Sequence, residues 1–464
     1  MTIKSLVYTS IISLSVISCN FLDETPEDFL SPTNFYTTQE DAIAAVNAVY
    51  DQLSYYNSMW QLGERPSDNI QDGPVSRDVS LELHTFTWNS ATGIFGSVWQ
   101  QVYESINRAN TALEQLPSID MNDNLRDRLT AETKFLRALN YFDLVRNFGG
   151  VPLITSSTED INNLFVTRAT EEEAYAQIVQ DLQEAEDVLP VSYASNEEGR
   201  ATQGAAKALL ARVLLYQGKY DAAAQKAKEV IDLGVYDLFD SVEDLWQVSN
   251  ENGIEHIFSV QYLAGVQGSG FSSQFAIRGG EPPLTGSSSA IVRQDLIDAF
   301  LPGDERKSAS ILDSYTFPDG TTVTYEPHIW KFYDETANDP TDGSTNWPVM
   351  RYAEVLLIYA EALNESSNGP NQEAYDAINK VRNRAGLDDL AEGMNQNQFR
   401  DALLLERRLE LCFEGHRYYD LKRTDNLNTA MQEVAVTVEA KHDLFPIPLR
   451  ETDANPNLEQ NVGY

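Results

Sequence analysis

The sequence has few cysteines and few basic residues. Only two cysteines, Cys19 and Cys412, occur among 464 residues. Two cysteines exclude a disulfide-rich scaffold and a cysteine-based zinc site. The 33 lysines and arginines are outnumbered by 71 aspartates and glutamates, so the formal net charge is −38. A surface of that charge repels phosphate backbones and anionic lipids, which argues against nucleic-acid binding and electrostatic docking on membranes.

Motifs of common enzyme classes are also missing. The sequence contains no GxSxG, GxxxxGK[ST], HExxH or helix-opening GxGxxG, and its five histidines are scattered without metal-ligand spacing. Residues 338–343 loosely resemble a calcium loop, but Pro340 takes a ligand position and Val349 replaces the closing glutamate. We therefore predict no catalytic residues, no metal and no cofactor, with a calcium site of another design left open. Glycoside hydrolysis needs only two suitably placed carboxylates, so that alternative also stays open.

Long hydrophobic runs are absent, apart from one short run at the start. The uncharged stretch from Leu6 to Ile17 follows Lys4 and is shorter than the roughly 20 residues that a membrane-spanning helix needs. It ends in the letters VISC, the pattern of a bacterial lipobox. We predict that residues 1–18 are a lipoprotein signal peptide and that Cys19 is lipidated. Residues 19–36, rich in acids and proline, are predicted to form a tether that holds the body off the lipid surface.

Helical periodicity dominates the rest of the chain. The letters TTQE at residues 37–40 are typical of a capping box, and long helices are predicted over about 95–116, 125–147 and 170–189. The segment 201–233 reads helix, tight turn, helix, with alanines at the contact positions. This pair resembles a tetratricopeptide repeat, and 351–366 with 372–384 is a second candidate pair. Because one pair cannot bury its own faces, the pairs are expected to stack.

Two inserts interrupt this periodicity, at about 55–94 and 235–348. They are rich in glycine, proline, serine and aromatic residues and contain short alternating pieces such as Ile257–Val260, which predict brief strands. A long irregular stretch in a helical protein usually builds a binding surface. The prediction is a single domain over 37–464, mainly α, with these inserts as its ligand-binding part.

The carboxy-terminal third carries a long and ordered motif. Residues 406–423 read ERRLELCFEGHRYYDLKR, 444–448 read LFPIP, 148–152 read FGGVP and 381–387 read VRNRAGL. These motifs, with NFLD directly after Cys19, resemble the SusD/RagB family of outer-membrane nutrient-binding lipoproteins. From the residues themselves, Cys412 lies on an apolar helical face and is expected to be buried. Arg407, Arg408, Glu410 and Arg417 are expected to form ion pairs between helices.

The resemblance implies both a fold and a role. The fold would be a right-handed superhelical scaffold of tetratricopeptide-like helix pairs, with an irregular, loop-rich half and a few short strands. The protein would sit on the outside of the outer membrane and pass an oligosaccharide to a SusC-like TonB-dependent transporter, without catalysing a reaction. Two alternatives are a peptide-binding protein of the RagB type and a surface glycoside hydrolase.

Sugar recognition needs aromatic faces ringed by polar groups. The resemblance implies that the early insert supplies this platform, and by order and spacing its residues would be Trp88, Arg77, Asp68, Asn69 and Trp60. We predict that alanine at Trp88 weakens ligand binding and leaves folding stability nearly unchanged. In the later insert, four further aromatic side chains could complete the platform. Residues 330–333 look more like a buried strand. Trp99 and Trp246 are expected in the core. The later candidates are Tyr315, Tyr325, Trp330 and Trp347.

Overall fold

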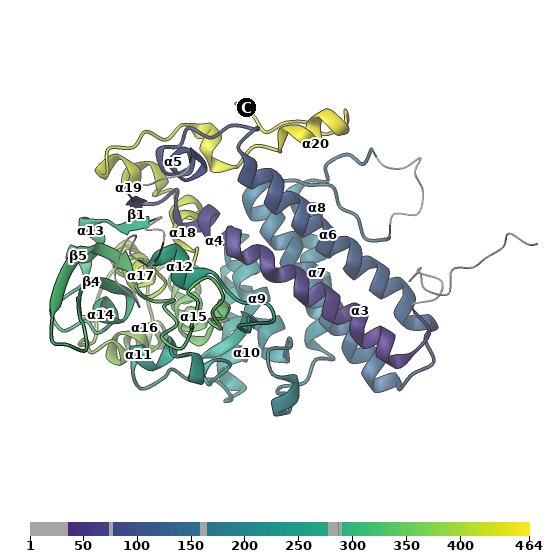
Figure 1. Cartoon of the computed structure of the whole chain (residues 1–464), viewed down its shortest axis with the longest axis horizontal. Helices are drawn as coiled ribbons and strands as arrows, with labels where there is room; N and C mark the ends of the chain where they lie inside the picture. The colour runs from purple at the N-terminus through teal and green to yellow at the C-terminus, as the bar shows by residue number, and fades with distance from the viewer. Residues whose placement is uncertain (1–35, 74–77, 158–164, 277–285, 287–289) are drawn as a thin grey trace, which may run out of the picture.

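A computed structural model describes residues 36–73, 78–157, 165–276, 286 and 290–464. The predicted signal peptide, the lipidation site Cys19 and nearly all of the predicted tether lie outside the described residues, as does Arg77. In Figure 1 the early helices form one side of the molecule, and the strands of the later insert lie on the other side. The carboxy-terminal segment runs along the top of this view. Within the described residues no helix is long and apolar enough to cross a membrane.

The long helices follow the predicted periodicity closely. The structure places helices at α3 Gln39–Asp51, α6 Gly93–Gln115, α7 Asp123–Phe148, α8 Glu171–Glu186, α9 Gln203–Tyr216, α10 Tyr220–Asp232, α15 Tyr352–Ser366, α16 Gln372–Arg384 and α17 Gln396–Glu410. Shorter helices are α4 Tyr56–Glu64, α5 Asp78–Thr85, α11 Val242–Leu245, α12 Phe271–Phe275, α13 Gln294–Ala299, α14 Arg306–Ser310, α18 Arg417–Arg423, α19 Leu427–Glu433 and α20 Leu449–Ala454.

The ends of the helices are set by capping residues and by a glycine. The capping box of α3 is formed by Thr38 and Asp41, one residue later than the TTQE pattern predicted. Thr170 and Glu173 make the equivalent box at α8. Helix α7 stops at Gly149, which adopts a φ of 74° and donates its N–H to the Val145 carbonyl. That left-handed conformation favours glycine, so the predicted helix stop is confirmed.

The helices pack in sequence order, each against its neighbours. Contacts join α3 to α6, α6 to α7, α7 to α8, α8 to α9, α9 to α10, α10 to α15, and α15 to both α16 and α17. At the α9–α10 turn, Gly218 adopts a φ of 67°. The contact alanines Ala208, Ala211, Ala223 and Ala227 are fully buried. Small side chains let the two helix backbones approach closely, so the predicted tetratricopeptide-like pairing is confirmed.

The inserts contain more regular structure than their composition predicted. The early insert includes α4, α5 and the strand β1 Ile70–Asp72. Strand β1 pairs with β3 in a four-stranded antiparallel sheet of order β1-β3-β5-β4, and β2 pairs with β6. The prediction of a brief strand near 257–260 is confirmed. The remaining strands are β2 His256–Val260, β3 Ala290–Val292, β4 Ile311–Thr316, β5 Thr322–Ile329 and β6 Trp347–Arg351.

Candidate functional site

Two of the predicted platform residues, Trp60 and Trp88, lie in the core. The Trp88 indole donates a hydrogen bond to the Tyr464 hydroxyl at 2.6 Å and packs against Phe86 and Phe445. Trp60 donates to the Gln274 side chain at 3.1 Å. The side chains of Trp88 and Trp60 are only 2% and 1% exposed, so neither presents a ring face to solvent. The expectation of an exposed platform from these two residues is therefore wrong in this structure, because long-range packing covers both rings.

Asp68 and Asn69 are also buried, and they contact the carboxy-terminal motif. The carboxylate of Asp68 accepts two hydrogen bonds from Arg417, at 2.7 and 2.8 Å. Asn69 donates to Glu64 and accepts from Arg408. Burial alone would raise the pKa of Asp68, but the Arg417 guanidinium outweighs it and holds that pKa below its ordinary value. In this structure these side chains tie the early insert to α17 and α18.

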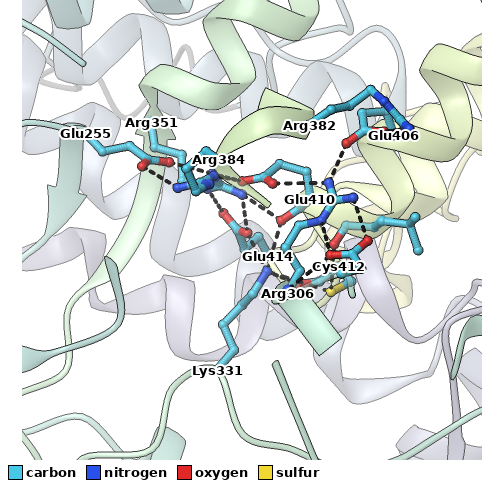
Figure 2. A network of polar contacts seen from close by, with 12 residues as sticks. Glu255, Arg306, Lys331, Arg351, Arg382, Arg384, Glu406, Glu410, Cys412 and Glu414 are labelled. Atoms are coloured by element: carbon cyan, nitrogen blue, oxygen red, sulfur yellow. Dashed lines mark hydrogen bonds and ion pairs between the residues drawn. The ribbon is translucent and has the colours of Figure 1, made fainter. Parts of the chain in front are cut away.

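The carboxy-terminal motif forms a buried ion-pair network, which Figure 2 shows. Glu406 and Glu410 are four residues apart on one face of α17, and Glu414 lies in the turn that follows the end of this helix. Glu410 contacts Arg351 at 2.6 Å, and Arg351 also contacts Glu414 at 2.7 Å. The further members are Glu255, Arg306, Arg382 and Arg384. The ion pairs expected between helices are confirmed for Glu410, Arg407 and Arg408, which pair with Arg384, Asp420 and Asp295. Arg417 instead pairs with Asp68, which lies between α4 and β1. Cys412 is buried as predicted.

Lys331 connects this network to the later insert. Its ammonium donates to the Glu414 carboxylate at 2.9 Å and to the Glu410 and Cys412 carbonyls at 3.0 Å. The same ammonium lies 4.7 Å from the ring centroid of Trp246. Because Lys331 is buried with these partners, it anchors the segment from Trp330 to Tyr333 to the protein interior.

The turn at Lys331 brings two aromatic rings together at the surface. Strand β5 ends at Ile329, and the Tyr333 N–H donates to the Trp330 carbonyl at 2.9 Å, closing a turn. The two rings stack with centroids 4.1 Å apart and 16° between their planes. Both side chains are half-buried, whereas Lys331 and Phe332 are buried. The expectation that residues 330–333 form a buried strand is therefore wrong: only the middle of the segment is buried.

These rings line a cleft of about 650 Å³, which we call the Trp330 cleft. Trp246, expected in the core, is half-buried and lines the same cleft. Its indole N–H has no hydrogen-bond partner among the described residues. The cleft is bounded by the region of α11, by α14 and by the turn after β5, and its polar lining includes Ser241, Glu243, Gln247, Ser249, Glu305, Ser308, Glu335 and Thr336.

Further aromatic residues lie next to the Trp330 cleft on the β4–β5 hairpin. Tyr315 is 6.4 Å from Trp330 and 5.1 Å from Phe317, measured between ring centroids. Both Tyr315 and Phe317 are half-buried, as is Tyr325. Trp347 is buried beneath, stacked on Phe332 at 4.8 Å, so its expected place on the platform is wrong. The arrangement combines flat apolar faces with hydroxyl, amide and carboxylate groups, the combination that suits sugar rings and their hydroxyls.

Two carboxylates of the candidate calcium loop accept hydrogen bonds from backbone N–H groups, one within the loop and one from another segment. The Asp339 carboxylate accepts from the Thr341 N–H, and the Asp342 carboxylate accepts from the Gly265 N–H. In the described part of the chain no cluster of three or more histidine, cysteine, aspartate or glutamate side chains could hold a metal ion.

Of the three aromatic residues that line the Trp330 cleft, only Trp330 is a platform candidate from the sequence alone. Trp330 was one candidate among four in the later insert, and Tyr333 and Trp246 were not candidates. The useful signal was the irregular composition of the insert around them. Whether a given ring in that insert faces solvent depends on the ion-pair network beneath it, which joins residues far apart in the sequence.

The fold and the motifs agree with comparisons to known proteins. A profile described as the SusD family matches residues 304–464. A second profile, described as starch-binding and associating with the outer membrane, matches residues 20–215. A SusD-like protein, P2, from Formosa agariphila is 31% identical, with 98% of each chain covered. The chain belongs to the SusD family.

Solved structures in this family have the same architecture. A laminarin-binding SusD-like protein superposes with a TM-score of 0.82 at 32% identity, covering 92% of this chain and 100% of the other. A SusD superfamily protein from Parabacteroides distasonis gives a TM-score of 0.84 at 28% identity, covering 94% and 100%.

Proposed function

We propose that this protein is a cell-surface glycan-binding lipoprotein. In this proposal Cys19 carries the lipid anchor in the outer membrane, and the body captures an oligosaccharide outside the cell. The protein then passes the glycan to a SusC-like transporter without cleaving it. Membership of the SusD family supports this proposal, as does the similarity to a laminarin-binding relative over its whole length.

The Trp330 cleft is the proposed binding site, and the stacked pair Trp330–Tyr333 is the observation that carries this assignment. A partly exposed aromatic pair costs free energy in water, and a pyranose covering it removes apolar surface from water. If one sugar ring covers roughly 60 Å² of ring surface, the gain is about 1.5 kcal/mol, or roughly tenfold in affinity. Lys331, between the two rings in the chain, is buried and bonded to Glu414, which limits the conformational entropy that the stack would lose on binding.

Affinity gel electrophoresis with single polysaccharides, followed by isothermal titration, tests this assignment. Trp330→Ala should weaken binding of a retained polysaccharide roughly tenfold. The matched control is Phe165→Ala, which removes an aromatic side chain that is 54% exposed and lies outside the cleft. Unchanged affinity in Trp330→Ala would remove the cleft from the binding site.

The peptide-binding and hydrolase alternatives give different outcomes in the same experiments. A peptide-binding protein should show no retardation in any polysaccharide gel. A hydrolase should shorten the retained polysaccharide during prolonged incubation, and the carboxylates of the cleft make that assay worth running. Intact chains after incubation, together with retardation in the gel, support the binding function.

A further inference from the structure

The charged groups of the Trp330 cleft are almost all of one sign. Glu243, Glu305 and Glu335 line it with exposed side chains, and none of them makes an ion pair with a described residue. Asp334 also lines the cleft, but it is buried and its two oxygens accept hydrogen bonds from Thr336 and Ser344. Three exposed glutamates are therefore part of the described lining of the space that a ligand would occupy.

Among the described residues, the lining of the cleft offers no cation that is free to balance these carboxylates. Lys331 is the only basic residue in the described lining of the cleft. Its ammonium is buried in the protein and already donates to Glu414 and to two backbone carbonyls. A ligand in the cleft therefore meets carboxylates directly, whereas the positive charge is neutralised within the protein.

From this arrangement we propose that the Trp330 cleft selects uncharged glycans and rejects polyanionic ones, such as sulfated or uronic-acid-rich chains. The inference rests on the proposed glycan-binding function and adds the ligand's charge class to it. Hydroxyl groups can donate to the three carboxylates, so a neutral sugar gains hydrogen bonds where a sulfate or carboxylate is repelled.

The size of the discrimination follows from Coulomb's law. Two like charges about 8 Å apart in water repel enough to weaken binding roughly twofold, and three such pairs weaken it roughly tenfold. The effect should be largest at low ionic strength and should shrink in about 0.5 M salt, where the screening length falls to a few ångströms.

The test compares neutral polysaccharides with sulfated derivatives of the same backbone, using the full chain. Affinity gels would contain laminarin, starch or dextran, each beside its sulfated form. The variant E243Q/E305Q/E335Q removes the three cleft charges, and E104Q/E433Q/E459Q removes three exposed charges from segments that do not line the cleft. Both variants change the net charge equally, so a difference between them reports the cleft alone.

The expected result is roughly tenfold tighter binding of a neutral polysaccharide than of its sulfated form at low salt. The cleft variant should narrow that gap, while the control variant should keep it. A sulfated form that binds as tightly as its neutral parent, or a gap equally narrowed by both variants, would overturn the inference while leaving glycan binding intact. Failure of every polysaccharide to bind would instead overturn the proposed function itself.

Discussion

Replacing Lys331 with methionine would test whether the buried network holds the cleft in place. Methionine has a similar length but no charge, so the substitution removes the ammonium and keeps most of the volume. The Glu414 carboxylate would lose its 2.9 Å partner, and the carbonyls of Glu410 and Cys412 would lose a donor at 3.0 Å. Trp246 would lose the cation 4.7 Å from its ring centroid.

The cost can be worked out from these contacts. Breaking a buried ion pair by removing one partner typically costs about 3–5 kcal/mol, because a charge is left buried and uncompensated. Glu414 would keep Arg351, with 2.7 Å between its Oε2 and the Arg351 Nε, so the lower end applies. We therefore expect Lys331→Met to lower the free energy of unfolding by about 3 kcal/mol. The stack of Trp330 on Tyr333 should also loosen, so glycan affinity should fall.

Urea unfolding followed by tryptophan fluorescence measures the change in stability. The control is Lys228→Met, which removes an exposed lysine paired with Asp232 one helical turn away. Exposed pairs of this spacing contribute about 0.3–0.5 kcal/mol, so the control should be nearly neutral. A loss below about 1 kcal/mol in Lys331→Met would refute the reasoning, because it would mean that the buried ammonium contributes no more than a surface charge.

Three further predictions follow from the packing. Trp88→Ala should lower the free energy of unfolding by about 3–5 kcal/mol in the same urea assay, because a buried indole leaves a cavity; an unchanged midpoint would contradict its core position. Burial raises the pKa of Glu251 to about 8. The contribution of this group to the free energy of unfolding is therefore fully present below its unfolded pKa near 4.5 and is lost as the pH rises through 8. Between pH 5 and pH 8.5, Glu251→Gln should therefore lose less unfolding free energy than the unaltered chain. Equal losses in the two proteins would contradict this prediction. Gly63→Ala should destabilise by about 1–3 kcal/mol or more, because its Cβ would lie 2.0 Å from the Gly415 carbonyl oxygen. Gly93→Ala, with nothing within 4 Å of its Cβ, should not destabilise, and similar melting of the two variants would contradict the close approach.

The local signals in the sequence predicted the helical scaffold well. Helix α7 is recognisable from its periodicity and from Gly149, and the α9–α10 pair from its alanines and Gly218. Such features depend on residues within one or two helical turns of each other, so they can be read without the tertiary structure. The long carboxy-terminal motif likewise pointed to the family, because its order of residues is retained along the chain.

The binding surface was decided by contacts that no local pattern contains. Trp88 and Trp330 both lie in irregular inserts, yet Trp88 is sealed in the core by Tyr464, 376 residues further along the chain. Trp330 stays partly exposed, while its neighbour Lys331 is buried and bonded to Glu414, 83 residues away. Sequence alone therefore established the helical scaffold and the family of this chain. Only the tertiary structure determined which rings face solvent, since the exposure of a ring depends on distant segments that pack over it or leave it open.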